Sequence, residues 1–94
     1  MRLWPRGKSE IDELVAALDE AAALLDASGH EHWAAWMRTS AAEIRASDRH
    51  GVERVLRAYG GMGSFNDVVF ADPRLGLLRG RIFMLADGLR REGL

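Results

Sequence analysis

The sequence predicts an all-α protein, folded as a compact four-helix bundle with a short extra helical turn after a glycine-rich loop. Apolar residues recur at spacings of three and four along most of the chain, which is typical of helices that bury one face. Capping residues and glycines divide the chain into separate segments. Alternation of apolar and polar residues, which indicates strands, is missing outside the short run VVF at 68–70.

The composition fits one soluble domain over residues 1–94, with residues 1–8 as an N-terminal arm. The chain is 48% hydrophobic and 29% charged, which argues against disorder. It has 0 Cys, so it can form no disulfide, thiol nucleophile or thiolate zinc site. The start MRLWPRGKSE has no apolar stretch typical of a signal peptide, and no run approaches the ~20 apolar residues of a membrane span. We therefore expect a cytoplasmic protein.

The first helix is expected to begin after Ser9, an N-cap residue with Asp12 three positions later. Gly29 is a natural C-terminal stop. The apolar positions between these two signals share one helix face, which predicts a buried stripe. They are Ile11, Leu14, Val15, Leu18, Ala22 and Leu25.

A second helix is predicted over about 30–46, with Trp33, Trp36, Met37, Ala41 and Ile44 as its apolar stripe. A third helix follows, with Asp48 as its N-cap and its end at Gly60. Its inward residues are expected to be Val52, Val55, Leu56 and Tyr59. Gly51 weakens this helix prediction, because glycine is a poor helix former.

The segment YGGMGSFNDVVF at 59–70 is expected to be mainly a junction between helices. Gly60 would take the left-handed conformation after the helix, and Ser64 with Asp67 would form a second capping-box-like pair. Residues 68–70 would make a single helical turn, and Met62, Phe65 and Phe70 would attach the segment to the core. The alternative is an anion-binding nest of glycine amides. The residues of this motif loop are Gly60, Gly61, Gly63, Ser64, Asn66 and Asp67.

The segment YGGMGSFND, preceded by the tryptophan-containing helix and the run DRHGVERVL, resembles a family of small bacterial domains of unknown function. The resemblance extends over about residues 33–70. It implies a compact bacterial helical domain, and it implies no activity, substrate or catalytic residue.

The last helix is predicted to begin at Asp72-Pro73, an N-cap followed by proline at the first helical position. Its buried stripe is Leu75, Leu78, Ile82, Leu85 and Leu89. Gly76 and Gly80 lie four residues apart beside this stripe. Because each glycine weakens a helix, we expect another backbone to approach closely at these two positions.

Charge is segregated along the chain, although the net charge is only −1. Residues 8–31 carry one base against seven acids, and residues 74–91 carry five arginines against one aspartate. In the first helix the acids repeat every seven residues and so form two stripes beside the apolar face. These stripes are Asp12, Asp19 and Asp26, and Glu13 and Glu20. They would either face solvent, pair with Arg79, Arg81 and Arg90 of the last helix, or dock on a basic partner.

Four further features have a structural and a functional interpretation. His30 and His32 are two residues apart and so point to different sides of a helix, which does not favour a metal site even with His50 added. The neighbours Asp26, Ser28 and His30 lack the geometry that defines a catalytic triad. Asn66, Asp67 and Asp72 are expected to cap helices rather than bind a metal. Trp4 would cover the bundle or contact a partner.

These observations predict a non-enzymatic protein-interaction module without cofactor or metal. Its most concrete form is an immunity- or antitoxin-like inhibitor that binds a basic partner protein through the acidic stripes. One alternative is a nucleic-acid binder that uses Arg49, Arg54 and Arg57 with the arginines of the last helix, although the overall charge argues against it. The other is a small-ligand binder at the 60–67 turn with His32 or His50.

Overall fold

The structure, a computed structural model, describes residues 6–93, with side chains from Glu10 onward. Four α-helices follow one another: α1 (Arg6–Ala27), α2 (Glu31–Arg45), α3 (His50–Arg57) and α4 (Pro73–Arg91). One turn of 3-10 helix, η1 (Phe65–Asp67), lies in the connection between α3 and α4. No strand occurs within residues 6–93. The predicted all-α fold with a short extra helical turn is confirmed.

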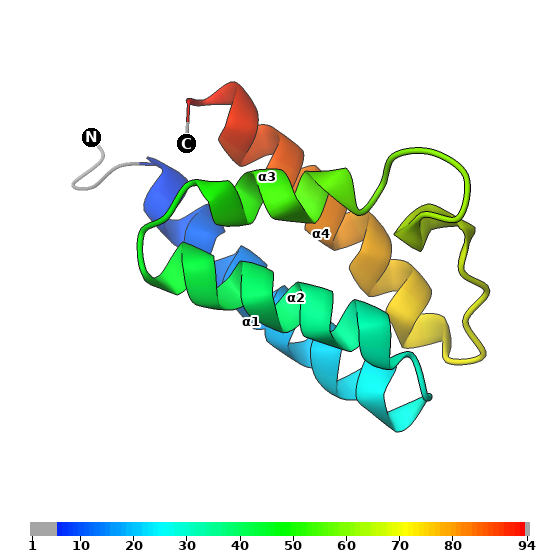
Figure 1. The fold of residues 1–94 in the computed structure, drawn as a ribbon. Helices are drawn as coiled ribbons and strands as arrows, with labels where there is room; N and C mark the ends of the chain where they lie inside the picture. Colours follow the sequence, from blue (N-terminus) through cyan, green and yellow to red (C-terminus); the bar gives the residue numbers. More distant parts are fainter. Residues whose placement is uncertain (1–5, 94) are drawn as a thin grey trace.

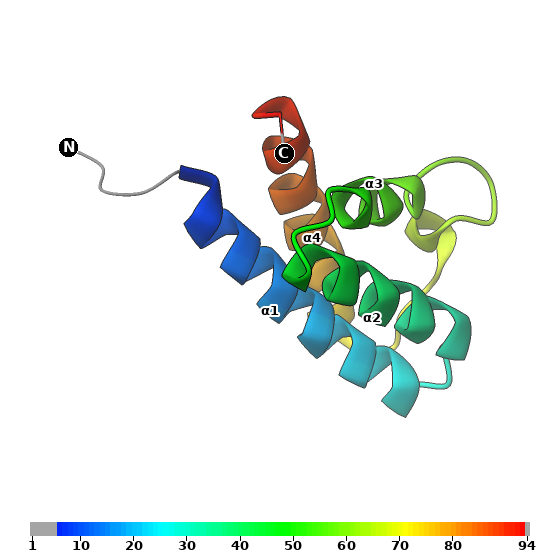
Figure 2. The same ribbon diagram turned by 60° about the vertical axis from the view of Figure 1, so that its left-hand side comes forward.

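The helices form a ring in which α1 packs on α2, α2 on α3, α3 on α4 and α4 on α1. Figures 1 and 2 show α1 and α2 side by side as an antiparallel pair, with α3 and α4 beside them and the α3–α4 connection looping out at one end. The beginning of α1 and the end of α4 lie at the same end of the bundle (Figure 1). None of the helices in the described part of the chain has the length and hydrophobicity needed to cross a membrane.

The core is filled by the predicted stripes. Fully buried side chains come from all four helices and from η1, because each amphipathic face turns toward the ring's interior. The largest are Phe65, Leu14, Leu18, Leu25, Met37, Leu75, Ile82 and Leu89. Trp33, Trp36, Leu56, Tyr59 and Leu85 are partly buried against this core.

Helix α1 begins at Arg6 and not after Ser9, so Ser9 lies inside the helix and cannot be its N-cap. Residues 6–8, which were assigned to the N-terminal arm, are therefore part of the helix. The prediction for Trp4 concerns a residue outside the described part of the chain. At the other end, Gly29 has φ +81° and donates its N–H to the Asp26 carbonyl oxygen. The His30 N–H bonds the Leu25 carbonyl, so α1 ends in a Schellman motif.

Helix α2 ends in the same way, although no glycine is present. The Asp48 N–H donates to the Glu43 carbonyl at 2.8 Å and the Ser47 N–H to Ile44 at 3.0 Å. Ser47 therefore takes the left-handed conformation, with φ +61°, which normally favours glycine. The Asp48 carboxylate then accepts the His50 N–H at the start of α3, although Arg49, and not the predicted Asp48, is the N-cap of this helix. This bond lowers the pKa of Asp48 below its ordinary value.

Helix α3 approaches α2 closely at Gly51. A Cβ atom at this position would lie 2.6 Å from Ile44 Cγ1 and 2.8 Å from the Ser40 carbonyl oxygen. Gly51 is buried and its φ is not positive, so this glycine is required by the space between two backbones. The glycine that weakened the prediction of α3 is thus the residue that lets α3 pack.

Helix α4 begins as predicted. The Asp72 carboxylate accepts the Arg74 N–H at 2.9 Å, and Pro73 occupies the first turn. The side chain of Arg74 also binds this carboxylate, and the resulting hydrogen bonds lower the pKa of Asp72.

Candidate interaction surfaces

The glycine-rich loop is closed by its own residues. Gly61 and Gly63 have positive φ, whereas Gly60 does not, so the expected left-handed position at Gly60 is wrong. The Phe65 N–H donates to the Ala58 carbonyl, and the Asp67 carboxylate accepts the Gly63 N–H at 2.7 Å. The Gly63 N–H, which an anion-binding nest would need for its ligand, is therefore already hydrogen-bonded to Asp67.

The expected capping pair at the start of η1 is only partly formed. Asp67 bonds the amide of Gly63, one residue before the N-cap Ser64, while the Ser64 hydroxyl makes no cap. That hydroxyl is buried and has no hydrogen-bond partner within residues 6–93. Asn66 is exposed.

Phe65 is the centre of an aromatic cluster that holds the loop to the bundle. Its ring is fully buried and lies 5.3 Å from Trp33, 5.6 Å from Tyr59 and 5.6 Å from Phe70, between ring centroids. Such aromatic pairs add stability beyond the buried area. Met62, which was expected to attach the loop to the core, is fully exposed, so that prediction is wrong.

Residues 68–70 do not form the expected helical turn, and Arg79 provides the reason. Val68 is extended, with ψ 133°, and its carbonyl accepts a hydrogen bond from Arg79 Nη1 at 2.7 Å. The same nitrogen donates to the Phe65 carbonyl at 3.1 Å, and the guanidinium lies 4.6 Å from the centre of the Phe70 ring. Arg79 therefore replaces the helical hydrogen bonds of this segment. It turns inward, away from the acidic residues of α1.

The five acidic residues of the two stripes on α1 all lie at the surface, and arginines of both neighbouring helices reach some of them. On the α2 side, Arg45 pairs with Asp19 and Arg38 pairs with Asp26. On the α4 side, Arg81 pairs with Glu13 at 3.5 Å. Glu20 lines a shallow groove with Arg74 and Arg81. Arg90, the third arginine expected to pair with α1, binds Asp87 of its own helix.

A further ion pair connects α2 with α3. Arg54 binds both carboxylate oxygens of Glu43, at 2.8 and 3.0 Å, and this hydrogen bonding lowers the pKa of Glu43. The indole N–H of Trp36 donates to the Arg54 carbonyl oxygen at 2.8 Å. This part of the surface therefore joins α2 to α3.

The three histidines have separate surroundings. His30 meets the edge of Phe70, His32 packs against Trp33, and the His50 ring lies 2.9 Å from the Asp48 carboxylate at the end of α3 opposite the glycine-rich loop. Within residues 6–93 no three histidine, aspartate or glutamate side chains come together as metal ligands. The Ser28 hydroxyl donates to the Leu24 carbonyl, and Asp26 binds Arg38, so Asp26, Ser28 and His30 do not assemble.

Helix α4 exposes an apolar face that the sequence analysis did not identify. Leu77 is 76% exposed, Met84 is 75% exposed and Phe83 is 40% exposed. Gly76 and Gly80 lie among them, and apart from the adjacent residues and backbone of α4 itself no atom lies within 4 Å of a Cβ built on either glycine. The expected close approach of another backbone is therefore wrong within this chain. Both glycines still weaken α4, each by roughly 1 kcal/mol relative to alanine.

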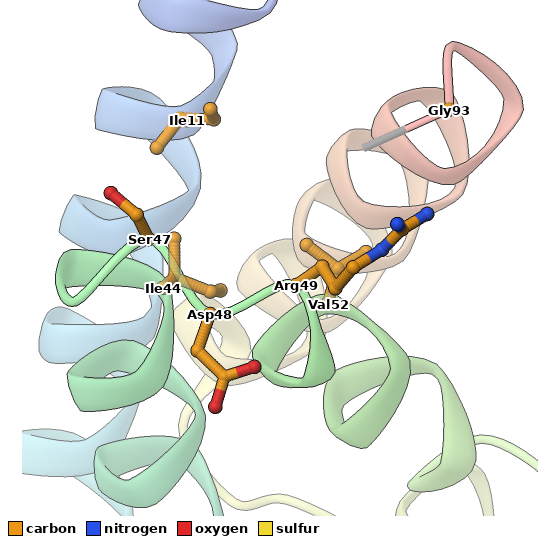
Figure 3. A pocket seen from close by; sticks show the side chains of 7 residues that line it. All are labelled: Ile11, Ile44, Ser47, Asp48, Arg49, Val52 and Gly93. Atoms are coloured by element: carbon orange, nitrogen blue, oxygen red, sulfur yellow. The ribbon is translucent and has the colours of Figure 1, made fainter.

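One further hollow lies at the end of the bundle where α1 begins and α4 ends (Figure 3). It is a cavity of about 320 Å³ with an apolar floor formed by Ile11, Ile44 and Val52. Ser47, Asp48, Arg49 and Gly93 complete its rim. The Asp48 carboxylate points away from Ile11 (Figure 3) and is engaged by His50.

The fold and surfaces define a small all-α protein that exposes one acidic helix and one apolar helix face. Residues 26–73, just over half of the chain, match the family model described as Domain of unknown function (DUF6966), and the chain belongs to this family. No curated protein and no solved structure matches the chain. The matched segment includes α2, α3 and η1, whereas most of α1 and nearly all of α4 lie outside it.

Proposed function

We propose that this chain is a bacterial protein-interaction module, of the immunity- or antitoxin-like inhibitor kind, that binds a basic surface of a partner protein through α1. The observation that carries this proposal is the exposure of all five carboxylates on the outer side of α1. They flank two exposed alanines, Ala16 and Ala23, which are small enough to let another surface approach.

The internal ion pairs of this face are compatible with binding. The side chains of Asp19, Asp26 and Glu13 remain 47%, 43% and 49% exposed in their pairs with arginine. Ion pairs of this exposure contribute little to stability, because water and salt screen them. Basic groups of a partner can therefore replace Arg38, Arg45 and Arg81 at low cost. Among the side chains of residues 10–93, ion pairs with arginine engage three of the five carboxylates, those of Glu13, Asp19 and Asp26.

A negatively charged helix of this kind is suited to cover a cationic groove, such as the phosphate-binding groove of an enzyme that acts on nucleic acid. Opposite charges on the two proteins would accelerate their encounter and suppress binding to acidic proteins. The glycine-rich motif has a different task in this proposal: it closes the junction between α3 and α4 and holds the frame that presents α1.

The geometry supports a protein partner better than nucleic acid. Among the arginines proposed for nucleic-acid binding, Arg54 is bound to Glu43, Arg79 to backbone carbonyls and Arg81 to Glu13. Arg49 and Arg57 remain exposed, and a mobility-shift assay across salt concentrations tests this alternative.

The acidic-face proposal is tested with Asp12→Asn, Asp19→Asn and Asp26→Asn, combined in one triple variant. Proteins captured from the native host are identified, and the dissociation constant of each purified complex is then measured across salt concentrations. The triple variant should weaken binding at least about tenfold at low salt and flatten the salt dependence.

The charge-matched comparison uses two double variants. Asp12→Asn/Asp19→Asn removes two charges from the face, whereas Glu31→Gln/Glu53→Gln removes two exposed charges elsewhere. Equal affinity of both double variants for the partner at low salt would contradict the proposal.

A further inference from the structure

The exposed face of α4 has two features that are unfavourable in an isolated chain. It presents Leu77, Phe83 and Met84 to solvent, and it contains Gly76 and Gly80 where no neighbouring atom requires glycine. These five residues are neighbours on the helix surface, because the other four each lie three or four residues from Gly80. A second backbone that packs over Gly80 would bury the apolar side chains and use the space that the glycines leave open.

We propose that the occupant of this face is a second copy of the chain, whose α4 crosses the first in antiparallel orientation at Gly80. A two-fold symmetric pair of this kind brings the same edge of both helices together. Leu77 and Met84 lie seven residues apart on the edge toward α1, where Leu77 lines the groove with Glu20. Gly76 and Phe83 lie seven apart on the edge toward α3, where Phe83 packs 5.2 Å from Tyr59.

The spacing makes this face complementary to itself. Leu77 precedes Gly80 by three residues and Met84 follows it by four, so an antiparallel crossing sets Leu77 of each copy beside Met84 of the other. Gly76 precedes Gly80 by four residues and Phe83 follows it by three, so each Phe83 ring meets the open position at Gly76 of the other copy. Large side chains thus face small ones on one edge and similar apolar chains meet on the other, which is how packed helices interlock.

Charge does not oppose this arrangement. Between Arg74 and Asp87 the outer side of α4 carries no uncompensated charge, since Arg81 pairs with Glu13 and Arg79 turns inward. At the two ends of α4, Asp72 pairs with Arg74, and Asp87 pairs with Arg90 and Arg91. A face without strong charge can pack against its own copy, and an antiparallel crossing also opposes the two helix dipoles.

This inference concerns a different face from the acidic surface of α1, and its test needs only the purified chain. Sedimentation of the wild type from about 1 μM to about 1 mM should show a monomer–dimer equilibrium. Gly80→Leu, which fills the crossing point, should raise the dimer dissociation constant at least about tenfold. Ala23→Leu adds the same side chain to an exposed position of α1 and should leave the constant unchanged.

Gly80→Ala separates loss of the interface from loss of folding. Alanine should stabilise the monomer, because it favours the helix, while it weakens the dimer by separating the two backbones. A wild type that remains monomeric over this range, or a dimer unaffected by Gly80→Leu, would overturn the proposal, as would assemblies larger than a dimer.

The absence of native cysteines allows the register to be tested directly. Gly80→Cys should form a disulfide-linked dimer under mild oxidation, because a disulfide needs Cα atoms about 4.4–6.8 Å apart. Ala23→Cys should not. An equimolar mixture of Leu77→Cys and Met84→Cys chains should form the mixed dimer faster than either forms its own. Equal cross-linking rates in all of these samples would show that the contact is nonspecific and reject the proposed crossing.

Discussion

Gly51 of α3 lies against Ser40 of α2, so that a Cβ atom on Gly51 would be only 2.8 Å from the Ser40 carbonyl oxygen. The obstacle is backbone, which cannot rotate away as a side chain can. Ile44 adds a second obstacle, since its backbone nitrogen would be 2.9 Å from the same Cβ atom. The distance between α2 and α3 is therefore set by the absence of a side chain at one residue.

Gly51→Ala is accordingly expected to destabilise the protein by about 1–3 kcal/mol or more, because the added methyl group forces the two helices apart. Gly76→Ala is the matched control, with no atom within 4 Å of the added carbon. It should stabilise the monomer by roughly 0.5–1 kcal/mol. Urea unfolding followed by circular dichroism at low micromolar protein measures both. A loss of stability in both variants would contradict this account.

Ser47→Gly is expected to stabilise the protein by about 1 kcal/mol, because Ser47 takes a left-handed conformation that costs less for glycine. The Ser47 side chain is exposed, so its removal sacrifices little packing. Ser47→Ala keeps the Cβ atom and should bring no such gain. If the alanine and glycine variants had the same unfolding midpoint, backbone conformation would not be the cause.

Arg79→Lys is expected to destabilise the junction between η1 and α4 by about 1.5–3 kcal/mol, the range for hydrogen bonds made by charged groups. Lysine can neither reproduce the guanidinium's approach to two carbonyls nor stack as well on Phe70. Hydrogen exchange should increase in the segment around Val68. Arg81→Lys, at an exposed ion pair, should change stability by less than about 1 kcal/mol. Similar losses in the two variants would exclude the proposed role of Arg79.

Tyr59 should make the protein sensitive to alkali. Burial raises the pKa of the Tyr59 hydroxyl well above its ordinary value of 10.0, and the hydroxyl donates to the Arg79 carbonyl at 2.8 Å. Because the pKa of the Tyr59 hydroxyl is raised in the folded state, the contribution of this hydroxyl to stability is complete below pH 10 and is lost as the pH rises further.

Tyr59 is the one tyrosine of the chain, so absorbance at 295 nm reports its ionisation directly. In urea the phenolate should form near pH 10, and in the folded protein only at higher pH, together with unfolding. Tyr59→Phe should weaken this alkaline transition. Ionisation of the folded protein near pH 10 would argue against the burial of this hydroxyl.

Most of the fold could be predicted because helix ends and buried stripes are local properties of the sequence. Gly29 and Asp72-Pro73 marked helix ends by their own backbone and capping chemistry, and the structure confirms both, whereas the N-cap of α3 is Arg49, one residue after the predicted Asp48. Spacing of apolar residues likewise identified the buried faces. The predictions that failed were those that depend on distances between residues far apart in the sequence. Gly51, Gly76 and Gly80 are all glycines within helices, and only the position of the neighbouring helix decides which of them is needed for packing.

The surfaces were predicted less completely, because a charged residue does not reveal its partner. Arg79 was expected at the surface and instead bonds two carbonyls of the segment before α4. The partners of Asp19 and Asp26 were sought only in the last helix, although Arg38 and Arg45 repeat with the same spacing of seven residues. This matching spacing of acids and arginines could have been used to predict the pairing of α1 with α2. The exposed side of α4 was missed because Leu77 and Met84 resemble ordinary core residues in sequence.

The paired seven-residue repeats of α1 and α2 mean that their charges alone cannot set how the two helices align. Sliding α2 by one heptad would exchange Asp26–Arg38 and Asp19–Arg45 for Asp19–Arg38 and Asp12–Arg45, the same number of pairs. The three-residue connection from Ser28 to His30 is too short to permit this slippage. Seven residues inserted there would leave two alignments of nearly equal electrostatic energy, and apolar packing would have to choose between them.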